Sequence, residues 1–84
     1  MRIMEVKKTT YEIDGCEEPC FEVTSEDVKV RIAPFYHFIG KNTILVTEFL
    51  DGEWNGQEEI NGDFDELTAA KAKEIARDMC VYLR

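Results

Sequence analysis

The alternation of apolar and polar residues predicts short strands over most of the first 60 positions. In the clearest segment, Val28, Val30 and Ile32 alternate with Lys29 and Arg31. A two-residue period is the pattern of a strand that buries one face. Turn-forming residues recur between such segments, at positions 14–15, 25–27, 40–42, 51–52, 55–56 and 61–62. Short strands joined by close turns predict an antiparallel meander.

The first strand candidate departs from simple alternation. Met4 and Val6 are apolar at even positions, whereas Tyr11 and Ile13 are apolar at odd positions. One face of a strand receives every second residue, so these two pairs cannot lie together on one face of a regular strand. We therefore expect either a bulge near residues 7–10 or a strand that moves between two packing layers.

The middle of the chain contains the most apolar strand candidates. Phe21 and Val23 predict a short second strand after Pro19. Residues 35–39 and 44–50 are apolar at both even and odd positions, which is typical of central strands covered on both faces.

A turn-rich segment follows at residues 51–57, and we interpret it as an excursion with a short hairpin around Asn55-Gly56. Trp54 lies within this segment, and two interpretations of it stay open. An aromatic side chain on an exposed acidic loop has the composition of a binding hot spot. Alternatively, Trp54 folds back over the core, as large aromatic side chains usually do.

A helical period replaces the strand pattern near the C-terminus. Apolar residues recur there with the spacing of one helix face, at Ala72, Ile75, Ala76, Met79 and Leu83. Asp63 and Glu66 have capping-box spacing, and Thr68 is a competing N-cap. The chain is therefore predicted to be one α+β domain. Its antiparallel meander sheet has four to five strands within residues 2–60, and it packs against one C-terminal amphipathic helix over about residues 64–83.

The formal net charge of −8 is unevenly distributed. No Lys or Arg occurs between residues 42 and 70, whereas eight acidic residues do: Glu48, Asp51, Glu53, Glu58, Glu59, Asp63, Asp65 and Glu66. A surface of this charge repels phosphate, which argues against direct nucleic-acid binding. The same surface would attract a protein partner with a basic surface.

Cysteine and histidine supply the remaining candidate chemistry. Cys16 and Cys20 are spaced C-x3-C, and together with His37 or Cys80 they would make a four-coordinate zinc site. Reduced thiols are the simpler interpretation, because an odd number of cysteines suits a reducing compartment and neighbouring acids raise thiol pKa values. His37 has no nucleophile motif nearby, so we assign no catalytic residue, no enzymatic activity and no cofactor.

The predicted sheet is wider than the one helix available to cover it, and this difference bears on function. Four or five strands make a sheet on the order of 20 Å wide, whereas one helix is about 10 Å across. The helix therefore shields only part of the apolar sheet, and an apolar patch rimmed by acidic residues marks an interaction surface. The predicted contact residues are Glu48, Asp51, Glu53, Trp54, Glu58, Glu59, Asp63 and Asp65.

These features predict a small acidic, non-enzymatic binding protein that docks on a basic partner. Small phage-encoded inhibitors of host nucleases, such as anti-CRISPR and anti-restriction proteins, often have this size and charge, although no motif links the chain to them. One alternative is a structural or assembly module that forms a homodimer. A second is a small thiol or metal-binding protein that uses Cys16 and Cys20. The chain shows no membrane-spanning segment or secretory signal, so we expect it in the cytoplasm.

Overall fold

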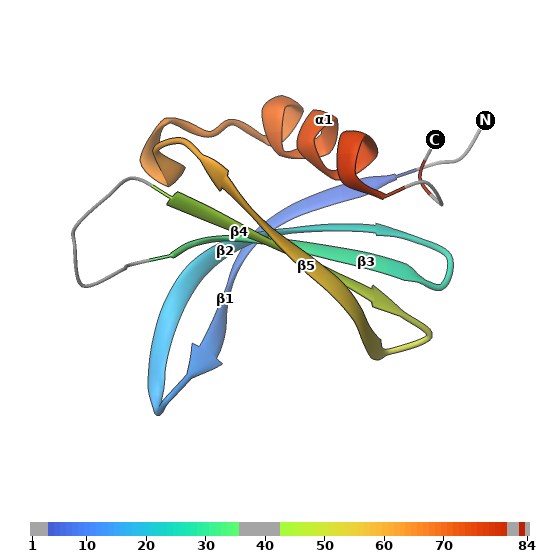
Figure 1. The fold of residues 1–84 in the computed structure, drawn as a ribbon, viewed down its shortest axis with the longest axis horizontal. Helices are drawn as coiled ribbons and strands as arrows, with labels where there is room; N and C mark the ends of the chain where they lie inside the picture. The colour runs from blue at the N-terminus through green and yellow to red at the C-terminus, as the bar shows by residue number, and fades with distance from the viewer. Residues whose placement is uncertain (1–3, 36–42, 81–82, 84) are drawn as a thin grey trace.

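The computed structural model describes residues 4–35, 43–80 and 83. Five strands form one antiparallel sheet in chain order, and a short 3-10 helix and an α-helix follow them (Figure 1). The elements are β1 (Glu5–Ile13), β2 (Cys16–Ser25), β3 (Val28–Pro34), β4 (Thr43–Leu50), β5 (Glu53–Asn61), η1 (Phe64–Glu66) and α1 (Ala69–Met79). The predicted α+β meander with one C-terminal helix is confirmed.

Two of the hairpins turn at Asp-Gly pairs. Asp14 and Gly15 have φ angles of 51° and 80°, and Asp51 and Gly52 have φ angles of 52° and 81°. Positive φ at both central residues matches the right-handed twist of the flanking strands, and Asp and Gly tolerate that region best. The turns predicted at these positions are confirmed.

The interpretation of residues 51–57 as an excursion is wrong. Asp51-Gly52 makes the turn, and β5 then continues from Glu53 in register with β4. Asn55-Gly56 lies inside β5, where the pairing shifts by one residue between Glu48 and Phe49 of β4. An Asn-Gly pair suits a bulge as well as a turn, and here it bends an edge strand.

The parity change in β1 has a simpler cause than a bulge. β1 pairs with β2 in one unbroken register, from Glu5 opposite Thr24 to Ile13 opposite Cys16. Val6 therefore lies on the face that α1 covers, and Tyr11 lies on the opposite face. The described pairing of β1 contains no bulge, and the two apolar pairs lie on opposite faces of one regular strand.

β2 is longer than predicted and includes Pro19. β3 pairs with β2 only from Phe21 to Ser25, so Pro19 lies in a part of β2 that is paired with β1 alone. A proline there interrupts no ladder on its other side, which explains why the strand runs through it.

Two predicted elements, a strand and a turn, lie wholly or mostly outside the residues that the structure describes. Most of the predicted strand at 35–39, His37 included, and the predicted turn at 40–42 lie outside the described residues. The strand predicted at 44–50 corresponds to β4, which lies between β3 and β5.

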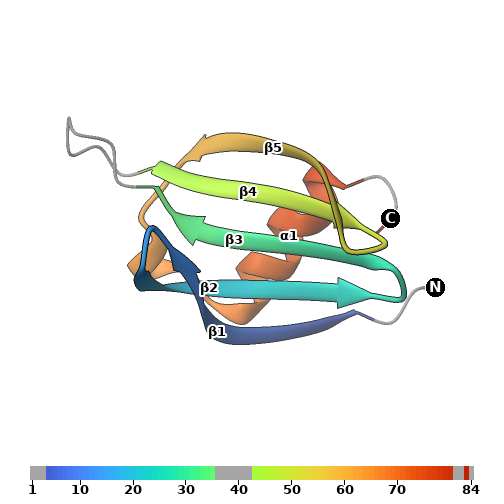
Figure 2. The same ribbon diagram turned by 90° about the horizontal axis from the view of Figure 1, so that it is seen from below.

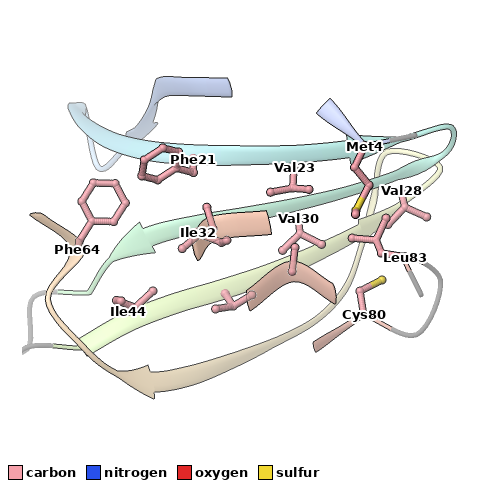
Figure 3. Close-up of a cluster of buried hydrophobic side chains, with 13 residues drawn as sticks. Met4, Phe21, Val23, Val28, Val30, Ile32, Ile44, Phe64, Cys80 and Leu83 are labelled. Atoms are coloured by element: carbon pink, nitrogen blue, oxygen red, sulfur yellow. The ribbon is translucent and has the colours of Figure 1, made fainter. Parts of the chain in front are cut away.

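The core lies between the sheet and α1. Figure 2 shows the five strands side by side, with α1 running diagonally behind them. α1 packs most closely on β1, β2 and β3. Side chains from these strands, from β4 and from the C-terminal segment fill the space between the layers (Figure 3). Phe64 extends this core beyond the helix, because its ring lies 5.6 Å from that of Phe21.

Both predicted helix caps are used, by two different elements. Asp63 caps η1, with its Oδ1 accepting from the Asp65 backbone N–H at 3.0 Å. Thr68 caps α1, with its Oγ1 accepting from the Lys71 backbone N–H at 3.2 Å. Leu67 is extended between them, so the predicted start of the helix near residue 64 is wrong for α1. Leu83 lies beyond the end of α1 and is buried.

We predict that Thr68→Ala lowers the free energy of unfolding by about 1 kcal/mol, because it removes the acceptor for an otherwise unpaired helix N–H. Thr68→Ser retains that acceptor and should lose less than half as much. Urea denaturation followed by circular dichroism measures both variants. Equal losses for the alanine and serine variants would show that the hydroxyl does not cap α1.

Candidate interaction surface

The predicted contact residues lie along and beside one edge of the sheet. β5 pairs only with β4, so its outer backbone groups face away from the sheet. We use the term β5 edge for the acidic residues of this strand and its flanking turns, together with Trp54. Its members are Asp51, Glu53, Trp54, Glu58, Glu59, Asp63 and Asp65. Neither β5 nor its flanking turns contain a Lys or Arg, because the sequence has none between residues 42 and 70.

Glu48, also a predicted contact residue, has a structural role. Its Oε1 accepts from the buried Cys80 thiol at 2.6 Å, and its Oε2 accepts from the Asn55 side-chain amide at 3.1 Å. These bonds connect β4 both to the residue that ends α1 and to the bulge in β5. Asp63 also has a structural role, because its carboxylate accepts the hydrogen bond that caps η1. The other acidic residues of the β5 edge are the stronger candidates for contact with a partner.

Trp54 is exposed, and the alternative in which it folds over the core is wrong. Its exposed fraction is 63%, the larger of the two high values found among large apolar side chains in the described residues. Trp54 is the cross-strand partner of Phe49, so it lies on the sheet face opposite α1. A tryptophan left in solvent beside acidic residues is typical of a contact residue.

The sheet face opposite α1, here called the open face, is shielded by its own long side chains. The Arg31 guanidinium lies 4.2 Å from the centre of the Tyr11 ring and 5.1 Å from that of Phe49. The Lys29 ammonium lies 5.1 Å from the Phe49 ring and 3.9 Å from a carboxylate oxygen of Glu22. Cation–π contacts of this kind hold extended side chains flat on the sheet.

Small residues of the open face are buried as a result. Cys20, Ala33 and Thr47 have exposed fractions of 0%, 1% and 2%. Strand parity places all three on the face that Arg31 crosses. This face therefore has a small covered centre, and it is not the bare apolar surface that the coverage argument predicted.

The helix side of the sheet has a gap in its cover instead. Two adjoining cavities, of about 370 and 180 Å³, lie between α1 and the β4–β5 hairpin and share Ile60 and Ile75. We call them together the α1–β5 groove. Ile44 and Val46 are buried at its floor, and half-buried apolar side chains form its walls: Ile60, Leu67, Ile75 and Met79. Its rim is mainly acidic, with Glu58, Asp63, Glu66 and Asp78 and one base, Lys71.

The groove residues were not predicted as a site. Ile60 and Leu67 are large apolar residues flanked by acidic residues, and that contrast is the signal that could have identified them. Ile75 and Met79 belong to the predicted apolar stripe of the helix, and nothing in the stripe shows which of its members face a gap.

The cysteines do not form the proposed thiol site. Cys16 and Cys20 are four residues apart on the single strand β2, so their α-carbons are separated by about 13 Å. That separation exceeds the reach of a disulfide and of two ligands to one ion. No cluster of three or more metal-ligating side chains occurs in the described part of the chain. The strand geometry therefore does not bring Cys16 and Cys20 together.

The open face changes two acid–base equilibria. Burial raises the pKa of the Cys20 thiol above 9.0, and the nearby Glu22 carboxylate raises it further. Burial also raises the pKa of the Tyr11 hydroxyl above 10.0, while the Arg31 charge partly opposes that shift. A buried thiol with a raised pKa is a poor nucleophile, which argues against redox or covalent chemistry at Cys20.

Comparisons of the chain with protein-family models, curated proteins and solved structures found no match. Within the described residues, no helix has the length and apolar character needed to cross a membrane.

We predict that the free energy of unfolding falls as the pH rises past 9.0 and 10.0, the ordinary pKa values of Cys20 and Tyr11. Both groups hold their proton more tightly in the folded protein, so their stabilisation is complete below these values and is lost above them. Tyr11→Phe keeps the ring over Arg31 and removes the ionising hydroxyl.

Urea denaturation across this pH range should therefore show a less steep loss of stability for Tyr11→Phe than for the unsubstituted protein. A difference between the two proteins that does not change with pH would contradict the raised pKa of the Tyr11 hydroxyl.

Proposed function

We propose that this chain is a non-enzymatic binding protein that docks on a basic surface of a protein partner through its β5 edge. The observation that supports the proposal is the gathering of acidic residues, without a basic residue, along one strand edge. Edge strands present unpaired backbone groups, and proteins use them for partner recognition when charge prevents self-pairing. Long-range attraction between this edge and a basic surface would speed association.

The charge of the β5 edge also indicates the class of partner. Proteins that handle nucleic acids present basic surfaces to phosphate, and a row of carboxylates competes for the same surfaces. A stoichiometric inhibitor of such a protein, like the phage-type inhibitors of anti-CRISPR and anti-restriction systems, is the function that best fits this surface. With a partner of that class, we propose the cytoplasm as the protein's location.

A homodimer through the β5 edge is not favoured. Two copies meeting at this edge would bring like charges together, which opposes pairing. The open face is also a poor surface for contact with a second copy, because charged side chains cover its centre. Sedimentation should therefore find a monomer at micromolar concentration.

Charge reversal on the β5 edge tests the proposal. Glu53→Lys, Glu58→Lys and Asp65→Lys together change the formal net charge from −8 to −2, and none of the three replaced side chains makes a described hydrogen bond. Affinity capture from host lysate, followed by titration of the captured partner with purified proteins, should show at least a tenfold loss of affinity. The affinity of the unsubstituted protein should fall as salt is raised.

A matched control separates position from net charge. Glu5→Lys, Glu12→Lys and Glu17→Lys produce the same net charge, but they lie on the β1–β2 hairpin at the opposite side of the sheet. This control should retain the affinity to within about threefold, since the remaining long-range charge effect is screened. Equal losses for the two triple variants, or binding that is insensitive to salt, would overturn docking through the β5 edge.

A further inference from the structure

The α1–β5 groove combines two features that together describe an occupant. Its floor and walls are apolar, with four half-buried large side chains in the described residues that line it. Among the described residues, its rim has four acidic residues and one lysine, and the Lys71 ammonium lies 3.5 Å from the Glu74 carboxylate. Burying apolar walls favours binding by about 25 cal/mol per Å² of area removed from water.

The dimensions of the groove suit side chains of a short segment. One wall consists of Leu67 and of α1 as far as Met79, and the part of α1 between Lys71 and Met79 is about 12 Å long at the helical rise. An extended chain covers that distance in about four residues. Two adjoining cavities therefore accommodate two apolar side chains from such a segment.

The acidic rim of the groove favours a positively charged segment. Acidic residues occur on both walls: Glu58 on β5, Asp63 and Glu66 in the connection, and Asp78 on α1. A segment lying in the groove would thus have carboxylates on both sides of it. Lys and Arg side chains suit this setting, because their apolar stems cover groove walls while their charged ends reach the rim.

From these features we infer that the α1–β5 groove binds a short segment of the partner that carries two apolar side chains flanked by Lys or Arg. This inference rests on the proposed function and adds to it. The β5 edge supplies long-range attraction, and the groove supplies the apolar anchor that makes the complex specific. Buried apolar anchors surrounded by polar rims are the usual arrangement of hot spots.

A labelled heptapeptide tests the inference directly. The probe has leucines at its third and fifth positions and Lys or Arg elsewhere, and the control peptide replaces both leucines with serine at the same charge. In titrations of the unsubstituted protein, the leucine peptide should bind at least about tenfold more tightly than the serine peptide. Two-dimensional NMR should show the backbone amides of Ile60, Leu67 and Ile75 shifting with the leucine peptide.

Matched variants locate the binding. Ile75→Ser should reduce affinity for the leucine peptide by about tenfold and leave affinity for the serine peptide unchanged. Ile13→Ser makes the same replacement at the tip of the β1–β2 hairpin, where Ile13 is 45% exposed, and should change neither affinity. If Ile75→Ser unfolds, the NMR shifts of the unsubstituted protein decide the outcome alone.

The outcomes distinguish the groove from the β5 edge. Equal affinity for the two peptides, absence of shifts at the groove amides, or shifts confined to other residues would overturn the groove inference. The charge-reversed triple variant should bind both peptides more weakly. If that variant instead binds its captured partner normally while the leucine peptide still occupies the groove, the edge proposal fails and the groove stands.

Discussion

The sheet is wider than its single helix, and this difference determines which parts of the sheet α1 leaves uncovered. Five strands at about 4.8 Å spacing are about twice as wide as a helix. α1 packs most closely on β1, β2 and β3, which leaves the space beside β5 open as the α1–β5 groove. The capped 3-10 turn at Phe64–Glu66 holds this arrangement, because Phe64 packs on Phe21 and fixes where the chain crosses the sheet.

The two faces of the sheet differ in how their apolar residues are shielded from solvent. On the open face, Arg31 lies between Tyr11 and Phe49, so a charged side chain serves as the cover for Cys20 and its small neighbours. That solution requires no second layer. On the helix side, apolar side chains from β5 and α1 border solvent among carboxylates. This difference between the two faces is the reason for proposing that a partner binds at the α1–β5 groove and the β5 edge.

Much of the fold was predictable, because local signals and tertiary packing agree in most of the chain. The Asp-Gly turns and the Thr68 cap follow from the preferences of one or two residues, and β3 follows from the alternation within its own sequence. The predictions that were wrong concern sequence features that suit two different structures. Asn55-Gly56 suits a turn or a bulge, and only pairing with β4 decides between them. The acidic edge was predictable from charge alone, whereas the groove was not, since it depends on where α1 crosses the sheet.

Solvent accessibility of isoleucine methyl groups tests the central geometric claim most directly. With a soluble nitroxide added to methyl-labelled protein, the δ1 methyls of Ile60 and Ile75 should relax much faster than those of Ile32 and Ile44, which are buried. Ile13 provides the exposed reference. Relaxation of Ile60 and Ile75 as slow as that of Ile32 would show that the groove is closed in solution and would contradict the account.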